Sequence, residues 1–322
     1  MVYLSCFNIS YKIIMELEYI VKKEDKDIMV KDLVKKRLKI SSRLYTKISK
    51  SIYLNNNKCY TSARANVGDK IIVNLDDAYE DKDNMYNKFK VWNHNIEIIY
   101  EDEYLLCVNK EKGIPCHPSA LHQEKTLYNA IINYYLNKNQ IVPIHFVNRL
   151  DKDTTGVVVI AKHKYIQEIL SKQMQNGTLK KKYIAVVYGK ISDKEGIIEK
   201  RIRRKENSII LRETTEDKDA EYAKTGYKVL KYNKEKNYTV VEVFLYTGRT
   251  HQIRVHFASI GHPLLGDELY AKESNVDIKN IYEYIDRQAL HAIEIKYNDM
   301  SKEEKCITAK MPQDIDRLTK FT

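Results

Sequence analysis

The chain contains the stretch Val147-Asn148-Arg149-Leu150-Asp151-Lys152-Asp153-Thr154-Thr155-Gly156, which leads directly into the apolar run Val157-Val158-Val159-Ile160. An aspartate on a polar loop beside a buried strand is unfavourable unless another group pairs with it. Arg149 and Asp151 can form a structural ion pair near a turn, or Asp151 can act as a nucleophile, acid or base. This stretch alone leaves both interpretations open.

A second segment concentrates polar and charged groups between residues 247 and 270. It contains Gly248-Arg249-Thr250-His251-Gln252-Ile253-Arg254 and, further on, Gly261-His262-Pro263 and Gly266-Asp267-Glu268-Leu269-Tyr270. We expect Thr250 to be the N-cap of a helix that buries Ile253, Phe257 and Ile260 and ends at Gly261, with Arg254 off the apolar face. Helix starts bind anions well.

A metal site is not expected in this segment. His251, His256 and His262 have no i, i+4 pair, and no cysteine or carboxylate stands at ligand spacing from them.

Around these segments, strand and helix patterns alternate. Residues 96–100, 104–109, 155–161, 183–188 and 239–246 read as strands, and residues 126–136 and 163–175 read as helices. No G-x-G-x-x-G or Walker sequence is present, which weakens the case for a nucleotide-cofactor fold. The order predicts an α+β fold with a mixed, largely antiparallel sheet.

A small basic module precedes this region. Residues 30–50 contain eight lysines and arginines against the single acid Asp32. The pattern predicts two short helices, the second capped by Ser41 or Ser42, followed by strands at 52–54 and 70–74. Two basic helices followed by small strands resemble an S4-type RNA-binding domain, although Ser51 stands where that family usually has glycine. The alternative is an ordinary small helical domain with a solvated basic face.

Bulk composition is that of a globular protein with a basic surplus. The 322 residues are 43% hydrophobic and 31% charged, and the formal net charge is +11. That surplus favours nucleic acid or an acidic membrane face, although a lysine-rich solvated surface explains it as well. The five cysteines form no C-x-x-C pair, and we find neither a membrane span nor a signal peptide. We expect a cytoplasmic, monomeric protein that does not bind membranes.

Taken together, the motifs resemble the RluA-type family of RNA pseudouridine synthases over about residues 93–315. The family's R-L-D-x-x-T-S-G motif appears at residues 149–156, with Thr155 in place of serine. Its K-x-Y motif appears at Lys181-Lys182-Tyr183 and its G-R-T-H-Q-x-R motif at residues 248–254. Two departures are Asn148 where the family often has histidine, and Glu111 where it has proline after lysine.

The resemblance implies an isomerase that converts uridine to pseudouridine by flipping the base out of structured RNA, without a cofactor. Asp151 would be the nucleophile, attacking either the sugar or the base, and Tyr183 would stack on the target base. Arg254 would pair with Asp151, and phosphate binding is the alternative for it. RNA contacts are expected at Arg149, Thr155, Arg249, His251, Gln252, Lys35, Lys36, Arg37, Arg43 and Lys47. Large-subunit ribosomal RNA is the favoured substrate and tRNA the second candidate.

These expectations divide the chain into five parts: an extension of unknown role at 1–14, an S4-like domain at 15–76, a linker at 77–92, the catalytic domain at 93–315 and a tail at 316–322. Two rival functions remain at this point. One is a non-catalytic RNA-binding or ribosome-assembly protein on the same fold, and the other is a hydrolase or lyase that uses an Asp–His pair.

Overall fold

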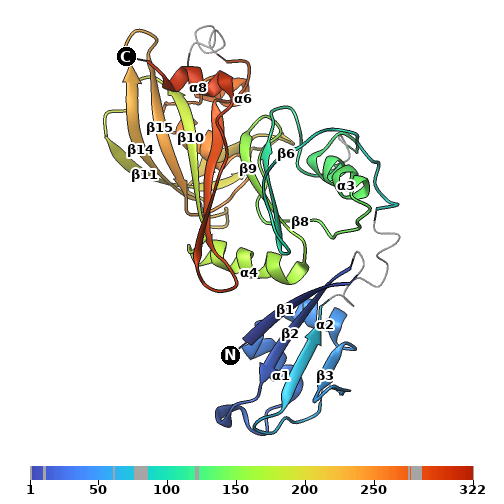
Figure 1. Cartoon of the computed structure of the whole chain (residues 1–322). Helices are drawn as coiled ribbons and strands as arrows, with labels where there is room; N and C mark the ends of the chain where they lie inside the picture. Colours follow the sequence, from blue (N-terminus) through green and yellow to red (C-terminus); the bar gives the residue numbers. More distant parts are fainter. Residues whose placement is uncertain are drawn as a thin grey trace.

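The computed structural model describes residues 2–9, 12–60, 62–75, 86–119, 123–274, 276 and 285–321, with the backbone alone for residues 2–9 and 12–14. The described residues form a small N-terminal domain, drawn in blue in Figure 1, and a larger domain that contains both motif-rich segments.

The N-terminal domain packs two short helices against a five-stranded sheet. The sheet order is β1-β2-β5-β3-β4, and Leu33, Val34 and Ile48 of the helices share one core with Leu17 and Ile71 of the sheet. Ser41 caps the second helix, as predicted, by accepting a hydrogen bond from the backbone N–H of Leu44 at 3.1 Å. The elements are β1 (Val2–Ile9), β2 (Lys12–Ile20), the 3-10 helix η1 (Lys23–Asp25), α1 (Val30–Arg37), α2 (Ser42–Ile48), β3 (Ile52–Leu54), β4 (Asn57–Lys58) and β5 (Lys70–Asn74).

Three of the expected domain boundaries need correction. The boundary at Met15 falls inside β2, because β1 and β2 form an antiparallel pair from Val2–Tyr19 to Ile9–Lys12. The end of the expected linker belongs to the larger domain, since the buried Tyr86 donates a hydrogen bond to the carbonyl of Val142 at 2.6 Å. Residues 77–85 of that linker lie outside the described residues.

The expected C-terminal tail is also part of the fold. A helix, α8 (Gln313–Thr319), spans the boundary at 316 and buries Ile315 and Leu318 against the sheet. Apolar residues three apart on one helix face explain why this segment packs rather than extending into solvent.

The larger domain is built on a ten-stranded sheet whose main path is β11-β14-β15-β10-β16-β9-β7-β6. Among the described strands of this sheet every pairing is antiparallel except that of β9 with β16, which confirms the predicted α+β class. Its strands are β6 (Glu97–Glu101), β7 (Leu105–Lys110), β8 (His145–Phe146), β9 (Thr155–Ala161), β10 (Lys180–Tyr188), β11 (Glu195–Glu199), β14 (Lys224–Asn233), β15 (Tyr238–Leu245), β16 (Leu290–Asn298) and β17 (Glu304–Thr308).

Around this sheet lie helices and a separate two-stranded ribbon. The remaining elements are α3 (Leu127–Asn137), α4 (Lys164–Gln175), β12 (Arg201–Arg204), β13 (Arg212–Thr215), α5 (Gln252–Ala258), α6 (Glu268–Ala271) and the 3-10 helix η3 (Lys272–Ser274).

The strand that follows the Asp151 loop is covered on both faces. All seven residues of β9 are buried. Val157 and Val159 pack with Ile166 of α4, whereas Val158 and Ile160 pack in the cluster that contains α3. A strand buried on both sides needs a continuous apolar run rather than alternation, which explains the sequence after Gly156.

Gly156 lets β9 approach β16 closely. Its φ is +116°, and a Cβ atom there would lie 2.2 Å from the carbonyl oxygen of Ala292. Any side chain would push the two parallel strands apart, so this position requires glycine. The Asp151 loop is thereby fixed at the point where it enters the sheet.

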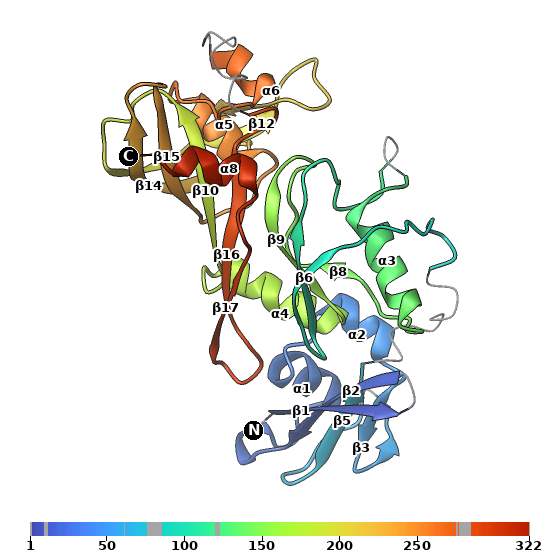
Figure 2. The same ribbon diagram turned by 45° about the horizontal axis from the view of Figure 1, so that its top comes forward.

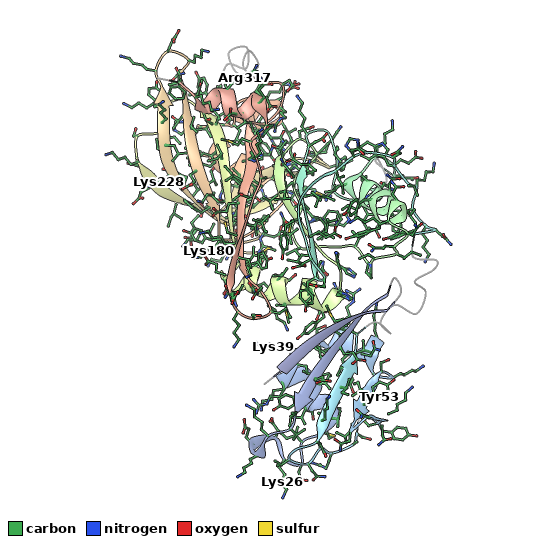
Figure 3. The ribbon with its side chains drawn as sticks, viewed as in Figure 1. Lys26, Lys39, Tyr53, Lys180, Lys228 and Arg317 are labelled. Atoms are coloured by element: carbon green, nitrogen blue, oxygen red, sulfur yellow. The ribbon has the colours of Figure 1, made fainter. Side chains whose placement is uncertain are left out.

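The N-terminal domain lies against α4, as Figures 1 and 2 show. Tyr165 of α4 donates its hydroxyl to the carbonyl of Leu38 at 2.8 Å, and Ser41 donates to Glu168 at 2.7 Å. Lys172 donates to the carbonyl of Lys39 at 2.9 Å, and Lys39 is labelled near this junction in Figure 3.

Candidate active site

The two motif-rich segments line one open cavity of about 620 Å³. Asp151, Tyr183 and Arg254, which lie far apart in the sequence, are all in its lining. They come from the loop before β9, from β10 and from α5. Basic side chains outnumber acidic ones here, because Asp151 is the one carboxylate among the described lining residues while Arg149, Lys152, Lys181, Arg249 and Arg254 supply positive charge.

Two buried cations hold the backbone just after Asp151. Lys110, at the end of β7, donates to the carbonyls of Lys152, Glu111 and Ile114 at 2.8–2.9 Å. Arg287 donates to the carbonyl of Asp153 at 2.8 Å and pairs with Asp314 through Nε and Nη2 at 2.8 and 2.9 Å. The loop therefore has fixed carbonyls while the Asp151 side chain stays partly open to the cavity.

Arg254 lies between two carboxylates. Its Nε and Nη2 bind both oxygens of the buried Asp267 at 2.7 and 2.8 Å, and its Nη1 donates to Asp151 at 3.2 Å. The bidentate pair fixes the plane of the guanidinium. Burial alone lowers the pKa of Arg254, but the hydrogen bonds and charges of Asp267 and Asp151 outweigh burial and raise it. A permanent cation therefore faces Asp151.

Asp151 has a second neighbour in His251, whose Nε2 lies 3.9 Å from the carboxylate. His251 occupies the N-cap position of α5 in the left-handed region, with φ 58°, and makes no side-chain cap. The prediction of Thr250 as N-cap is therefore wrong. Nδ1 of His251 lies 2.9 Å from the Tyr270 hydroxyl, and burial lowers the pKa of the imidazole despite the charge of Asp151.

Tyr183 lies on the cavity side of β10 and is almost completely buried. Burial raises the pKa of its hydroxyl, and the charge of Asp151 raises it further. The phenol is therefore protonated at neutral pH. It offers a ring face and a hydroxyl donor to whatever occupies the cavity.

The structure separates the residues expected to contact RNA into two groups. Arg149 and Arg249 line the cavity. Arg149 is exposed, whereas Arg249 is partly buried, donates to the carbonyl of Tyr222 at 3.0 Å and pairs with Glu221 at 3.1 Å. Thr155 is buried, with its hydroxyl 2.9 Å from Nδ1 of His291, and Gln252 uses both ends of its amide within the protein. The polar groups of Thr155 and Gln252 are thus bonded within the protein, which favours structural roles for both, and their RNA contacts stay predictions.

Gln252 instead organises the turn before α5. Its Oε1 accepts from Thr247 at 2.8 Å and from the backbone N–H of Arg249 at 3.0 Å, while its Nε2 donates to the carbonyl of Lys224 at 3.0 Å. It therefore holds Gly248 and Arg249 at the rim of the cavity.

In the N-terminal domain, Lys36, Arg43 and Lys47 are exposed, and Lys35 lies over the ring of Tyr45 at 4.8 Å. Arg37 differs from them. Its guanidinium pairs with the buried Asp25, with Nη2 2.7 Å from the carboxylate, so it has a structural role in this domain, and its RNA contact stays a prediction.

The alternative ion pair of Asp151 with Arg149 is not formed in the described structure, where the carboxylate pairs with Arg254. Sequence reasoning did not assign roles to Asp267, Lys110 or Arg287. Asp267 stands in the Gly266–Tyr270 motif, so the sequence marked it as a candidate. The motif does not indicate that Asp267 pairs with Arg254.

Within the described ranges no group of three or more His, Cys, Asp or Glu side chains is arranged to hold a metal ion. Among the same residues, no helix combines the length and the apolar character that crossing a membrane requires.

Comparison with known proteins agrees with this site. Residues 104–259 match a family model described as RNA pseudouridylate synthase. The chain is 38% identical over 226 residues to an uncharacterized RNA pseudouridine synthase, YjbO, of Bacillus subtilis, covering 70% of this chain and 76% of that protein. It is 34% identical over 231 residues to the ribosomal large subunit pseudouridine synthase D of Vibrio cholerae, covering 70% of each.

A solved structure, human RNA pseudouridylate synthase domain containing 1, shares the fold, with a TM-score of 0.55 and 21% identity over 69% of this chain and 85% of that chain. Fold and sequence thus define the class of an RNA-modifying isomerase. The chain belongs to the RluA-type family of RNA pseudouridine synthases.

Proposed function

We propose that this protein converts uridine to pseudouridine in structured RNA, with Asp151 as the nucleophile. The observation that carries the proposal is the ion pair of Asp151 with Arg254 at 3.2 Å inside a cavity that Tyr183 also lines. The reaction breaks the N1–C1′ bond and forms a C5–C1′ bond. It needs an ionised carboxylate, tight positioning and exclusion of water, and we expect no cofactor.

Arg254 aims the nucleophile, because the bidentate bond to Asp267 prevents the guanidinium from turning away. Attack on C1′ of the sugar and attack on the base are both compatible with a carboxylate held in this position.

The target base has to leave the RNA stack to reach Asp151, since its reacting atoms are inaccessible inside a helix. In this proposal the flipped base stacks on Tyr183, whose protonated hydroxyl can donate a hydrogen bond. Arg149, exposed at the rim, fills the vacated space or grips the backbone, and Arg249 adds a phosphate contact.

Large-subunit ribosomal RNA is the favoured substrate, and tRNA is the second candidate. Support comes from the relatives named ribosomal large subunit pseudouridine synthase D, of which the one from Vibrio cholerae covers 70% of this chain. The N-terminal domain supports a large RNA as well, because exposed Lys36, Arg43 and Lys47 supply phosphate contacts that orient RNA without reading its sequence. We propose that this domain is S4-like in function.

The test gives unmodified large-subunit ribosomal RNA and unmodified tRNA, separately, to the wild-type protein and to Asp151→Ala, and maps pseudouridine along each RNA. We expect modification of defined uridines by the wild type and a loss of rate on the order of 10⁴-fold in Asp151→Ala. Asp153→Asn is the matched control, because its carboxyl group is two residues away and should leave the rate unchanged. Equal modification by wild type and Asp151→Ala would sink the assignment of the nucleophile.

A further inference from the structure

One buried cation in the cavity lining, Lys181, binds neither the Asp151 carboxylate nor the backbone of the Asp151 loop. The structure describes five buried lysines and arginines: Lys110, Lys162, Lys181, Arg254 and Arg287. Four of them bind carboxylates or backbone carbonyls, whereas the described hydrogen-bond partner of Lys181 is the sulfur of Met174, at 3.6 Å. A buried ammonium group without oxygen partners is unfavourable, so its donors point to an absent ligand.

Lys181 is built into the cavity. The residue is only 6% exposed and belongs to the lining. It stands two residues before Tyr183 on β10, so both side chains leave the strand on the same face. The ammonium nitrogen lies 3.2 Å from where a Cβ atom of Gly248 would be, so a side chain at 248 would crowd it. Figure 3 labels the preceding residue, Lys180, where β10 begins near α4.

The position of Lys181 indicates which group of the RNA substrate its ammonium group would contact. Among the described residues, the hydrogen bond of the ammonium group goes to the sulfur of Met174 and not to Asp151, and Lys181 stands on the same face of β10 as Tyr183. Lys181 is only 6% exposed, whereas Arg149 at the rim is exposed, so Arg149 is the better placed of the two to meet a backbone phosphate. The acceptor that fits Lys181, beside the ring proposed to stack on the base, is a carbonyl oxygen of a flipped uracil.

We propose that Lys181 is a catalytic residue that binds a carbonyl oxygen of the target uracil and stabilises the negative charge that develops there. This inference rests on the proposed function. If Asp151 attacks C1′, the N1–C1′ bond breaks and its electron pair stays on the uracil, spread over O2 and O4. If Asp151 adds to C6, the ring electrons move to O4 as an enolate. Both routes place charge where a preorganised cation acts most strongly.

The pH dependence follows from burial. Burial lowers the pKa of Lys181 to about 8, while the pKa of His251 is lowered and those of Tyr183 and Cys116 are raised. Lys110, with a pKa also lowered by burial to about 8, lies outside this cavity lining. The other charged or titratable groups of the lining are His117, Arg149, Asp151, Lys152, Arg249 and Arg254. Lys181 acts only when protonated, so activity falls as pH rises through about 8.

The kinetic test compares wild type, Lys181→Met and the control Lys182→Met, whose lysine faces Glu242 and Glu294 on the sheet. For Lys181→Met we expect kcat to fall on the order of 10²–10³-fold with KM unchanged. The alkaline decline near pH 8 should become shallower in what activity remains, because Lys110, which holds the Asp151 loop, is the other lysine whose pKa is lowered to about 8. A raised KM with an unchanged kcat would indicate a phosphate contact and overturn the proposal, as would wild-type kinetics.

A second measurement does not depend on catalysis. Lysine side chains labelled with ¹³C at the ε carbon are titrated by NMR, and the Lys181 signal is assigned by its loss in Lys181→Met. Saturating uridine should raise the pKa of Lys181, because an oxygen acceptor favours the ammonium form, and inorganic phosphate should not. A response to phosphate alone, or no response to uridine, overturns the contact. A uridine response in a protein that modifies no RNA would instead reject the proposed function.

Discussion

Positive charge gathers in two regions of this molecule, and the two regions use it differently. In the cavity, Arg254 is buried and bound at both ends, to Asp267 and to Asp151. In the N-terminal domain, Lys36, Arg43 and Lys47 stand exposed on or beside short helices. The first kind of charge acts on one group through fixed geometry, and the second acts on a polyanion through a screened field.

The effect of a charged side chain on stability therefore depends on how deeply it is buried. A buried charge that loses its partner costs several kcal/mol, whereas an exposed charge changes little by itself. Arg287 is instructive here, because it is as buried as Arg254 but binds the loop's backbone instead of the Asp151 carboxylate. Substitutions of Arg254, of Arg287 and of the exposed basic residues should therefore differ in the magnitude of their effect and in the property that they change.

The largest effect is expected for Arg254→Met. Asp267 would be left buried without a partner, which should lower the free energy of unfolding by about 3–5 kcal/mol. The rate should also fall, on the order of 10²–10³-fold, because Asp151 loses its cation. Urea unfolding and kcat measure the two losses separately.

A double variant separates structure from chemistry at this pair. Arg254→Met combined with Asp267→Asn removes the unpaired buried charge, so stability should recover in part while the rate stays low. Recovery of the rate together with stability would show that Arg254 matters only for folding.

An intermediate effect is expected for Arg287→Met. The carbonyl of Asp153 would lose its hydrogen bond and Asp314 would lose its bidentate partner, which should destabilise the fold by about 1–3 kcal/mol. Since Arg287 does not touch the cavity, kcat should fall less than in Arg254→Met, with KM little changed. A kcat as low as that of Arg254→Met would mean that the position of the loop, rather than the ion pair, dominates the rate.

The smallest effect is expected for the triple variant Lys36→Gln, Arg43→Gln, Lys47→Gln. RNA affinity should weaken, and the slope of log K against log salt should become shallower by up to roughly 0.7–0.9 for each phosphate that the protein no longer neutralises. The matched control replaces Lys228, Lys231 and Lys234, exposed on the catalytic domain; Lys228 is labelled far from the N-terminal domain in Figure 3. Equal changes in both triple variants would reject a dedicated RNA-binding role for the domain.

Local signals in the sequence predicted much of the fold. The strands at 52–54, 70–74 and 155–161 begin and end where expected, because apolar runs and turn residues mark them. The domain boundaries were less accurate. Residues 2–9 pair with residues 12–19 in a hairpin that continues into the expected domain, and α8 packs on β10 and β15, which lie far from it in the sequence. Periodicity reveals neither contact.

The same distinction applies to the site. Asp151, Tyr183 and Arg254 were recognisable from motifs, and they meet in one cavity. Thr155 and Gln252 stand in those motifs too, yet their polar groups turn inward to His291 and to the 224–249 backbone. Whether a motif residue faces the cavity or the protein depends on side-chain direction, which a motif does not encode. The Arg254–Asp267 pair and the isolation of Lys181 likewise exist only after folding.

Helix α4 has a consequence for how the two domains depend on each other. Tyr165, Glu168 and Lys172 of α4 form hydrogen bonds with the N-terminal domain. The last turn of the same helix places Met174 against the ammonium group of Lys181. A catalytic domain cut free of its neighbour would expose the α4 surface that now covers Leu38 and would invite aggregation. A shortened version that stays soluble therefore needs polar replacements on the outer face of α4 but must keep Met174 in place.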